Sequence, residues 1–180
     1  MASTAQVSVR PATPGDAAAI AAVQSRGWRA AYAGLLPEDV LEALDAAALT
    51  PSWREAVLAA NGTRNALLVA VSDDIVVGFA TAGPSDDGDA GEGDGLLAVL
   101  VVDPAHQRAG HASRLLSAAA DHLREQGLTV VRAWSPELDY ARRTFLTSAG
   151  MEPDGATRGY LGAEGREVVE LRLAASLGEP

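Results

Sequence analysis

The chain contains no cysteine and no lysine, because its fourteen basic residues are all arginine. Without cysteine it has no disulfide, no thiolate metal site and no cysteine nucleophile, as is typical of a reducing compartment. No apolar run approaches the roughly 20 residues that span a bilayer. The first ten residues, M-A-S-T-A-Q-V-S-V-R, lack the basic start and apolar stretch of a signal peptide. We therefore expect a cytoplasmic protein that is not embedded in a membrane.

The chain is strongly acidic. Its 24 acidic and 14 basic residues give a formal net charge of −10, and the pI is near 4.6. This balance argues against a nucleic-acid partner, which would attract a basic face. It favours a cationic substrate such as an amine, although an acidic surface also serves solubility alone. A chain of 180 residues is long enough to bury one full core, so we expect one domain spanning 1–180.

Two common signatures and a metal-ligand pattern are missing. G-x-S-x-G and G-x-x-x-x-G-K-S/T do not occur, which excludes the commonest serine hydrolases and P-loop proteins. His106, His111 and His122 are separated by five and eleven positions, whereas metal ligands on one helix face lie three or four apart. We expect no metal site. We interpret His111 as a backbone donor whose ring faces solvent.

The most informative stretch runs from Leu96 to Gly127. Its first part, Leu96–Val102, is an unbroken apolar run that predicts a strand buried on both faces. Its last part has apolar residues at helical spacing from Ala112 to Leu123, which predicts an amphipathic helix. Gly127 is a natural left-handed end for that helix.

A polar turn separates this strand from this helix. The turn comprises Gln107, Arg108, Ala109, Gly110, His111 and Ala112. A helix start binds anions because its unpaired N–H groups and the positive end of its dipole point the same way. Gly110 has no Cβ, so the backbone can approach a bulky phosphate closely. Arg108 and Arg114 add positive charge, and the predicted ligand is a pyrophosphate.

The rest of the chain predicts strands and helices in mixed order. The expected strands are 7–10, 66–71, 75–82, 129–134, 160–161 and 167–173, and the expected helices run from 13 to 32, from 36, from 50 and from 138 to 149. Ser85–Asp94 has no apolar side chain larger than alanine and is expected to be a flexible acidic loop. The sum is about seven strands and four or five helices in one α/β or α+β domain.

Gln107-x-x-Gly110-x-Ala112, after a buried strand and at a helix start, resembles the acyl-CoA pyrophosphate loop (Q/R-x-x-G-x-G/A) of the GNAT superfamily of N-acetyltransferases. The likeness extends in element order over nearly the whole chain, from Val7 to Leu173. It is particularly close to small bacterial members that begin with R-P-A-x-x-x-D and carry W-R-A-A-Y and G-L-L-P. Those segments are 10–16, 28–32 and 34–37 here.

The resemblance implies a mixed, mostly antiparallel sheet of about seven strands flanked by helices, with a splayed central strand pair. It implies acetyl-CoA as cosubstrate, with the diphosphate on the turn and the pantetheine arm paired with the central strand. A primary amine of a small molecule or peptide would attack the thioester directly, while a strand N–H near Val101 or Val102 donates to the oxyanion. The residues so assigned to the cofactor are Leu100, Val101, Val102, Gln107, Arg108, Ala109, Gly110, His111, Ala112, Ser113 and Asp139.

The general base is a first open question, since the attacking amine must lose a proton. In the family the base is often a carboxylate at the start of the central strand, where this chain has Leu96. Glu92 and Asp94 lie just upstream and are our candidates, acting through a water. The alternative is that both are solvated loop acids, because exposed carboxylates near their usual pKa are poor bases.

The general acid is a second open question. Family members commonly carry N-x-x-A-x-x-F-Y, whose tyrosine protonates the departing thiolate, but here Leu146 follows Phe145 and Asp139 takes the asparagine position. Three alternatives remain: Tyr140 reaches in from the preceding turn, Ser135 or water serves, or the thiolate leaves unassisted. A positioned acid contributes roughly 10²–10⁴-fold, so its loss predicts a slow enzyme. We take Tyr140 as the candidate.

Trp28 and Tyr32 are the candidate acceptor-binding residues. Spaced four apart, they share a helix face, and the resemblance makes this helix one wall of the acceptor pocket. The alternative is that both pack in the core. Arg142 and Arg143 are interpreted as exposed helix residues rather than ligands of a CoA phosphate.

Two rival functions remain. The first is a catalytically weak or inactive acyl-CoA-binding sensor or partner module, motivated by Leu146. The second is a generic nucleotide-binding α/β domain, which the lack of G-x-G-x-x-G after the strand disfavours. The sequence does not identify the acceptor, and it leaves a homodimer as open as a monomer.

Overall fold

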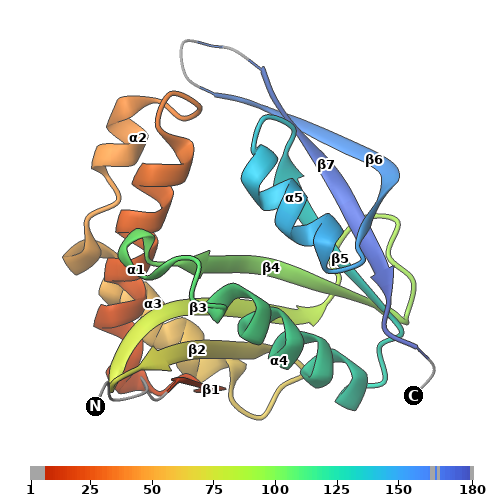
Figure 1. The fold of residues 1–180 in the computed structure, drawn as a ribbon, viewed down its shortest axis with the longest axis horizontal. Coiled ribbons are helices and arrows are strands. Elements are labelled where there is room, and N and C mark those ends of the chain that lie inside the picture. The colour runs from red at the N-terminus through yellow and green to blue at the C-terminus, as the bar shows by residue number, and fades with distance from the viewer. Residues whose placement is uncertain (1–6, 163–164, 166, 179–180) are drawn as a thin grey trace.

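The computed structural model describes residues 7–162, 165 and 167–178, which form a seven-stranded sheet with helices on both faces (Figure 1). The strand order is β1-β2-β3-β4-β5-β7-β6. Every pairing is antiparallel except that of β4 with β5. The strands are β1 (Val7–Pro11), β2 (Ala66–Ser72), β3 (Ile75–Pro84), β4 (Asp94–Val102), β5 (Val130–Pro136), β6 (Glu152–Leu161) and β7 (Glu167–Ser176). This architecture confirms the expected mixed, mostly antiparallel sheet.

Three helices lie between β1 and β2, one lies between β4 and β5, and one lies between β5 and β6. They are α1 (Ala17–Tyr32), α2 (Glu38–Glu42), α3 (Ala46–Ala60), α4 (His111–Glu125) and α5 (Tyr140–Ser148), with 3-10 turns at Pro14–Asp16 and Pro104–His106. Within the described ranges, no helix is long and apolar enough to cross a bilayer.

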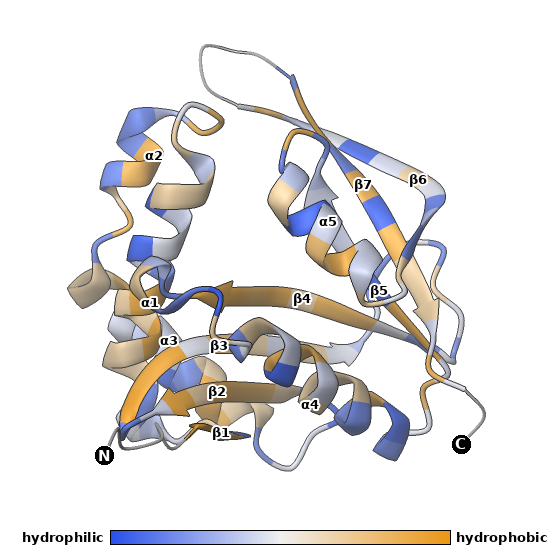
Figure 2. Cartoon of the chain, in the orientation of Figure 1, coloured by the Kyte–Doolittle hydropathy of each residue, from blue (hydrophilic) through white to orange (hydrophobic). Residues whose placement is uncertain are grey.

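The sheet divides the core into two layers. Successive side chains of a strand point to opposite faces. Leu67 and Val69 of β2 accordingly pack with α1 and α3, whereas Leu68 and Ala70 pack with α4. Figure 2 shows β2, β3 and β4 as the apolar centre of the molecule and the polar side of α4 turned outward. Burial on both faces explains why β2 and β3 are nearly continuous apolar runs.

The central strands β4 and β5 separate soon after they meet. They pair only over Asp94–Leu96 with Val130–Arg132. On the other edge of β4, the register with β3 shifts, so that Ala98 is an extra residue between Leu97 and Val99. Such a bulge bends and twists a strand and is common beside active sites. The expected splayed strand pair is therefore confirmed.

Four local expectations were wrong. The strand β6 begins at Glu152 instead of at residue 160. The strand β4 is not buried on both faces, because Ala98 is exposed and Val99–Val102 are half-buried where the splay opens. The helix α3 begins before Thr50, since the Asp45 side chain accepts from the amides of residues 47 and 48 and caps it at Ala46. The strand β5 does not break at Ser135, because it continues through Pro136, which pairs with Glu170 of β7.

The acidic loop 85–94 was expected to be flexible, but ion pairs hold it. Arg172, whose side chain is 6% exposed, contacts Asp87 at 3.1 Å and Asp89 at 2.6 Å. Arg132 reaches Asp94 at 2.8 Å, and the Trp134 indole donates to Asp87 at 3.0 Å. The arginines lie more than 35 positions further along the chain, so local composition carried no sign of them.

Candidate active site

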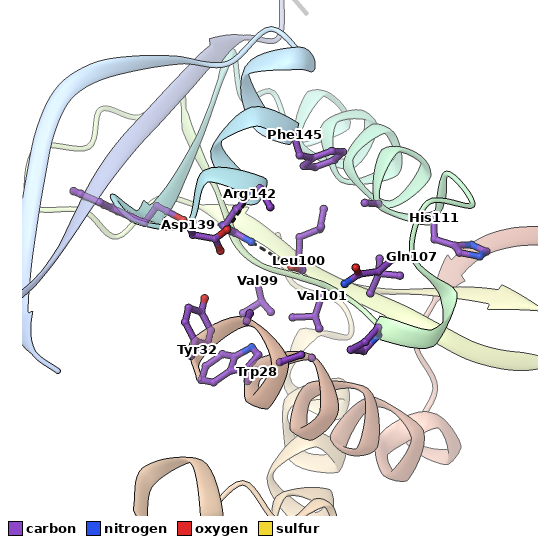
Figure 3. A pocket seen from close by; sticks show the side chains of 18 of the residues that line it. Trp28, Tyr32, Val99, Leu100, Val101, Gln107, His111, Asp139, Arg142 and Phe145 are labelled. Carbon is purple, nitrogen blue, oxygen red and sulfur yellow. Dashed lines mark hydrogen bonds between the residues drawn. The ribbon is translucent and has the colours of Figure 1, made fainter. Parts of the chain in front are cut away.

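A cleft of about 1130 Å³ opens where β4 and β5 separate. Figure 3 shows Gln107 and His111 at one end, Leu100 in the middle, and Tyr32 and Asp139 at the other end. The first end lies at the start of α4. We call the opposite end, formed by α1, β5, the start of α5 and the β6–β7 hairpin, the acceptor end. The structure brings every residue assigned to the cofactor to this cleft except Ala109.

The turn before α4 has the geometry of an anion site. Gly110 is the N-cap residue with φ of 78°, and Arg108 has φ of 62°, so two left-handed residues shape the turn. No side chain caps the helix, and its first intrahelical bond runs from the Arg114 amide to the Gly110 carbonyl. The amides of residues 111–113 precede that bond and lack intrahelical acceptors. Together with the helix dipole, they suit a phosphate.

Two histidines supply unused polar atoms at the same end of the cleft. His111 is 3% exposed, so the expectation that its ring faces solvent was wrong. Burial lowers the pKa of His111, and the positive charges of Arg114 and His106 lower it further. Nδ1 of His106 and of His111 is buried without a hydrogen-bond partner in the described part of the chain. Both residues line this end of the cleft, but their Nδ1 atoms are buried from it.

Arg142 bridges the two separated strands. Its Nε donates to the carbonyl of Trp134 on β5 at 3.2 Å, and its Nη1 donates to the carbonyl of Leu100 on β4 at 3.2 Å (Figure 3). Arg142 lines the cleft. It is therefore not the exposed helix arginine that the sequence suggested, because the splay leaves strand carbonyls that need donors.

The Leu100 contact also fixes which backbone groups face the cleft. Both polar groups of a residue in a strand point to the same edge, and the edge alternates along the strand. Leu100 and Val102 therefore direct their N–H groups to the gap, and Val101 directs its own to β3. The Asp103 amide, which donates to Val77 of β3 at 2.8 Å, agrees with this alternation. Of the two residues proposed as oxyanion donors, the register favours Val102.

Trp28 and Tyr32 line the acceptor end from α1. Their rings meet edge to face, with centroids 5.6 Å apart. Burial raises the pKa of Tyr32 above its usual value, and the charges of nearby Arg142 and Asp139 act in opposite directions. The Tyr32 hydroxyl points toward Asp139 in Figure 3. A phenol with a raised pKa stays protonated at neutral pH and offers a hydrogen-bond donor to a ligand.

The opposite wall of the acceptor end was missed by sequence reasoning. It is formed by Trp134, Arg158, Tyr160 and Glu170. Arg158 Nε donates to Glu170 Oε2 at 2.6 Å, and its guanidinium lies 4.3 Å from the Trp134 ring centroid. Burial is the main cause that raises the pKa of Tyr160, and the negative charge of Glu170 adds to it. These residues come from β5, β6 and β7, and only the predicted terminal hairpin hinted that β6 and β7 would be neighbours.

The structure does not bring the candidate acid and bases to the cleft. Tyr140 is 67% exposed, and its ring faces Arg143 at 5.7 Å. Asp94 is paired with Arg132 at 2.8 Å, and Glu92 is exposed in the acidic loop. Ser135 is fully buried, also away from the cleft lining. Among the residues that the structure describes, no group of three or more histidines and carboxylates is placed to hold a metal ion.

A sheet that separates at its centre, beside a helix start shaped for an anion, suits an acyltransferase that uses a phosphorylated thioester carrier. Comparison with models of known protein families identifies the family. Residues 28–151 match the model of the acetyltransferase (GNAT) family. The chain therefore belongs to the acetyltransferase (GNAT) family.

Relatives are similar in fold but distant in sequence. The mycothiol acetyltransferase of Kineococcus radiotolerans is 36% identical over 115 residues, which cover 58% of this chain and 36% of that protein. The PaiA N-acetyltransferase of Thermoplasma acidophilum, solved with coenzyme A, has a TM-score of 0.76 at 14% identity, covering 95% and 99% of the two chains. YncA of Salmonella typhimurium, solved with acetyl-CoA, has a TM-score of 0.71 at 23% identity, covering 97% and 95%.

Proposed function

We propose that the chain transfers the acetyl group of acetyl-CoA to the primary amine of a small molecule or a peptide amino terminus. The observation that carries the proposal is the uncapped start of α4, which opens into the cleft at the splay. An anion suits those amides, and an extended thioester arm suits the edge of β4. The two structural neighbours solved with coenzyme A or acetyl-CoA support this choice of carrier.

The proposed binding mode follows the cleft from one end to the other. The diphosphate lies on the amides of residues 110–113, with Gln107 and Arg108 beside it. The pantetheine arm runs along the free edge of β4 from Val102 to Leu100. The thioester then reaches the gap bridged by Arg142, and the acceptor enters from the acceptor end.

The amine attacks the thioester carbonyl directly within this ternary complex. Its nitrogen must be unprotonated, and with Asp94 and Glu92 outside the cleft lining we assign its proton to water in the open cleft. The N–H groups of Leu100 and Val102 face the gap, so one of them donates to the oxyanion. The rate should therefore rise with pH until the acceptor amine is fully deprotonated.

In place of a general acid, Arg142 stabilises the leaving thiolate by its charge. Leu146 is 1% exposed and cannot donate a proton. Arg142 lies one turn earlier on α5, and its Nη2 has no partner among the described residues. As the C–S bond breaks, the electron pair passes to sulfur, and the coenzyme A thiolate forms beside a fixed positive charge. The thiolate needs no protein acid in this arrangement.

The alternative function is an acyl-CoA sensor or partner module with little or no catalysis. It is favoured by the placement of Tyr140, Asp94 and Glu92 outside the cleft lining. The deciding experiment measures coenzyme A binding by calorimetry and thiol release from acetyl-CoA with a panel of primary amines. Binding with release for at least one amine supports the enzyme. Tight binding with no release for any amine supports the sensor.

A further inference from the structure

The acceptor end carries balanced charge in a protein whose formal net charge is −10. Two guanidinium groups, Arg142 and Arg158, line it together with two carboxylates, Asp139 and Glu170. The charges of Arg142, Asp139 and Glu170 all act on the pKa of the Tyr32 hydroxyl, so these groups lie around one space. A receptor for a polycation would present an excess of carboxylates. This one presents equal numbers of both signs.

The guanidinium of Arg158 is held in place by two neighbours, while part of its donor edge is free to bind a ligand. The Trp134 ring supports one face at 4.3 Å, and Glu170 accepts from Nε at 2.6 Å. The two terminal nitrogens, Nη1 and Nη2, have no partner in the described ranges. A planar fork of this kind is suited to a carboxylate, which it contacts through two parallel hydrogen bonds.

The remaining walls suit an ammonium group and an apolar body. Asp139 and Glu170 each have one carboxylate oxygen for which no partner is found in the described part of the chain, and either oxygen suits an incoming ammonium. Trp28, Leu36 and Tyr160 line the same end and offer apolar surface. The acceptor end therefore combines a site for a cation, a site for an anion and apolar walls.

We propose that the acceptor is a small amino carboxylate with an apolar side chain, such as a free amino acid, whose carboxylate is bound by the terminal nitrogens of Arg158. This inference rests on the proposed function and narrows its substrate class. In the reaction, the α-nitrogen forms a bond with the acetyl carbon, the C–S bond breaks and its electron pair stays on sulfur. The nitrogen's proton passes to water, and the carboxylate remains bound and unchanged.

The test compares three forms of the same acceptor: the amino acid, its amide and the amine without the carboxyl carbon. Leucine, methionine and phenylalanine provide three such sets. The amide controls for basicity. Its α-amine is less basic than that of the amino acid, so at a given pH a larger fraction of the amide is unprotonated and able to react. The amide also imitates a peptide amino terminus. The measured quantity is kcat/KM with saturating acetyl-CoA, and calorimetry of coenzyme A checks the cofactor site separately.

The variant is Arg158→Gln, and Arg143→Gln is its control. Arg143 is also a partly exposed arginine, and its Nη1 donates to the Glu137 carbonyl at 2.8 Å outside the cleft lining. We expect the wild type to favour the amino acid over its amide by at least about tenfold. Arg158→Gln should lower kcat/KM for the amino acid by about 10- to 100-fold and leave the amide within about threefold. The control should preserve the preference.

The outcomes separate this inference from the proposed function. A wild type that uses the amide as well as or better than the amino acid overturns the inference, as does a preference that survives Arg158→Gln. Coenzyme A binding without acetylation of any panel member also overturns it and leaves the cofactor site standing. Absence of coenzyme A binding removes the proposed function itself. Equal losses for acid and amide in Arg158→Gln make Arg158 a structural residue and contradict the inference.

Discussion

Arg142 offers the sharpest test of the proposed chemistry, because it predicts a property of bound coenzyme A that needs no turnover. If its guanidinium stabilises the thiolate, the thiol of bound coenzyme A ionises at lower pH than a free thiol. Arg142→Met keeps an unbranched apolar stem and removes the charge and the donors. The variant loses donors to the Leu100 and Trp134 carbonyls, which cleft water can replace, so we expect a stability loss of only about 1 kcal/mol.

The size of the effect follows from the position of the charge. A positive unit charge within about 4–6 Å lowers the pKa of an acidic group by roughly 1–3 units. The cleft is open to solvent and Arg142 is only half-buried, so screening favours the lower part of that range. We predict that the thiol pKa of bound coenzyme A is about 1–2 units lower in the wild-type complex than in Arg142→Met.

The assay is the ultraviolet absorbance of the thiolate, titrated with the protein in excess over coenzyme A. Arg143→Met is the matched control on the same helix and should behave as the wild type. Equal thiol pKa values in wild type and Arg142→Met would refute thiolate stabilisation by Arg142. In that case, we would assign protonation of the leaving thiolate to water.

Three further predictions concern the turn, the predicted acid and the start of α1. Gly110→Trp should weaken coenzyme A binding at least about 100-fold by calorimetry, because a left-handed φ and a bulky side chain both oppose the phosphate site; unchanged affinity would contradict the placement of the diphosphate. Tyr140→Phe should leave kcat within about twofold, whereas loss of a true general acid costs 10²-fold or more. Asp16→Asn should cost about 1–2 kcal/mol of unfolding free energy at pH 7, because bonds from Arg10 and Thr13 hold the pKa of Asp16 at about 2. A lowered carboxyl pKa stabilises above about pH 4, and that gain disappears as pH falls through about 2, so urea titrations of wild type and variant should converge there.

The features that the sequence predicted well are local in the chain. The phosphate turn depends on Gly110, on the helix start that follows it and on the apolar strand before it, all within about one supersecondary unit. The resulting geometry, with Gly110 at φ of 78°, needs no distant residue to form. Strand and helix periodicity likewise identified most elements, because each face of the sheet is buried by its own set of helices.

The features that the sequence did not predict depend on contacts between distant residues. Arg142 was interpreted as an exposed helix residue, because its partners are strand carbonyls that become free only where the sheet splays. Arg158 and Glu170 face the cleft only because β7 pairs with β5 and carries β6 beside it. The ring of His111 is buried although it follows an exposed turn. None of these positions has a periodic or spacing signal.

The measurement that tests the central claim most directly is a crystal structure of the chain with coenzyme A. The account predicts the diphosphate within hydrogen-bonding distance of the amides of residues 110–113 and the thiol in the gap beside Arg142. Phosphates bound elsewhere, or a turn that protein atoms occlude, would contradict it.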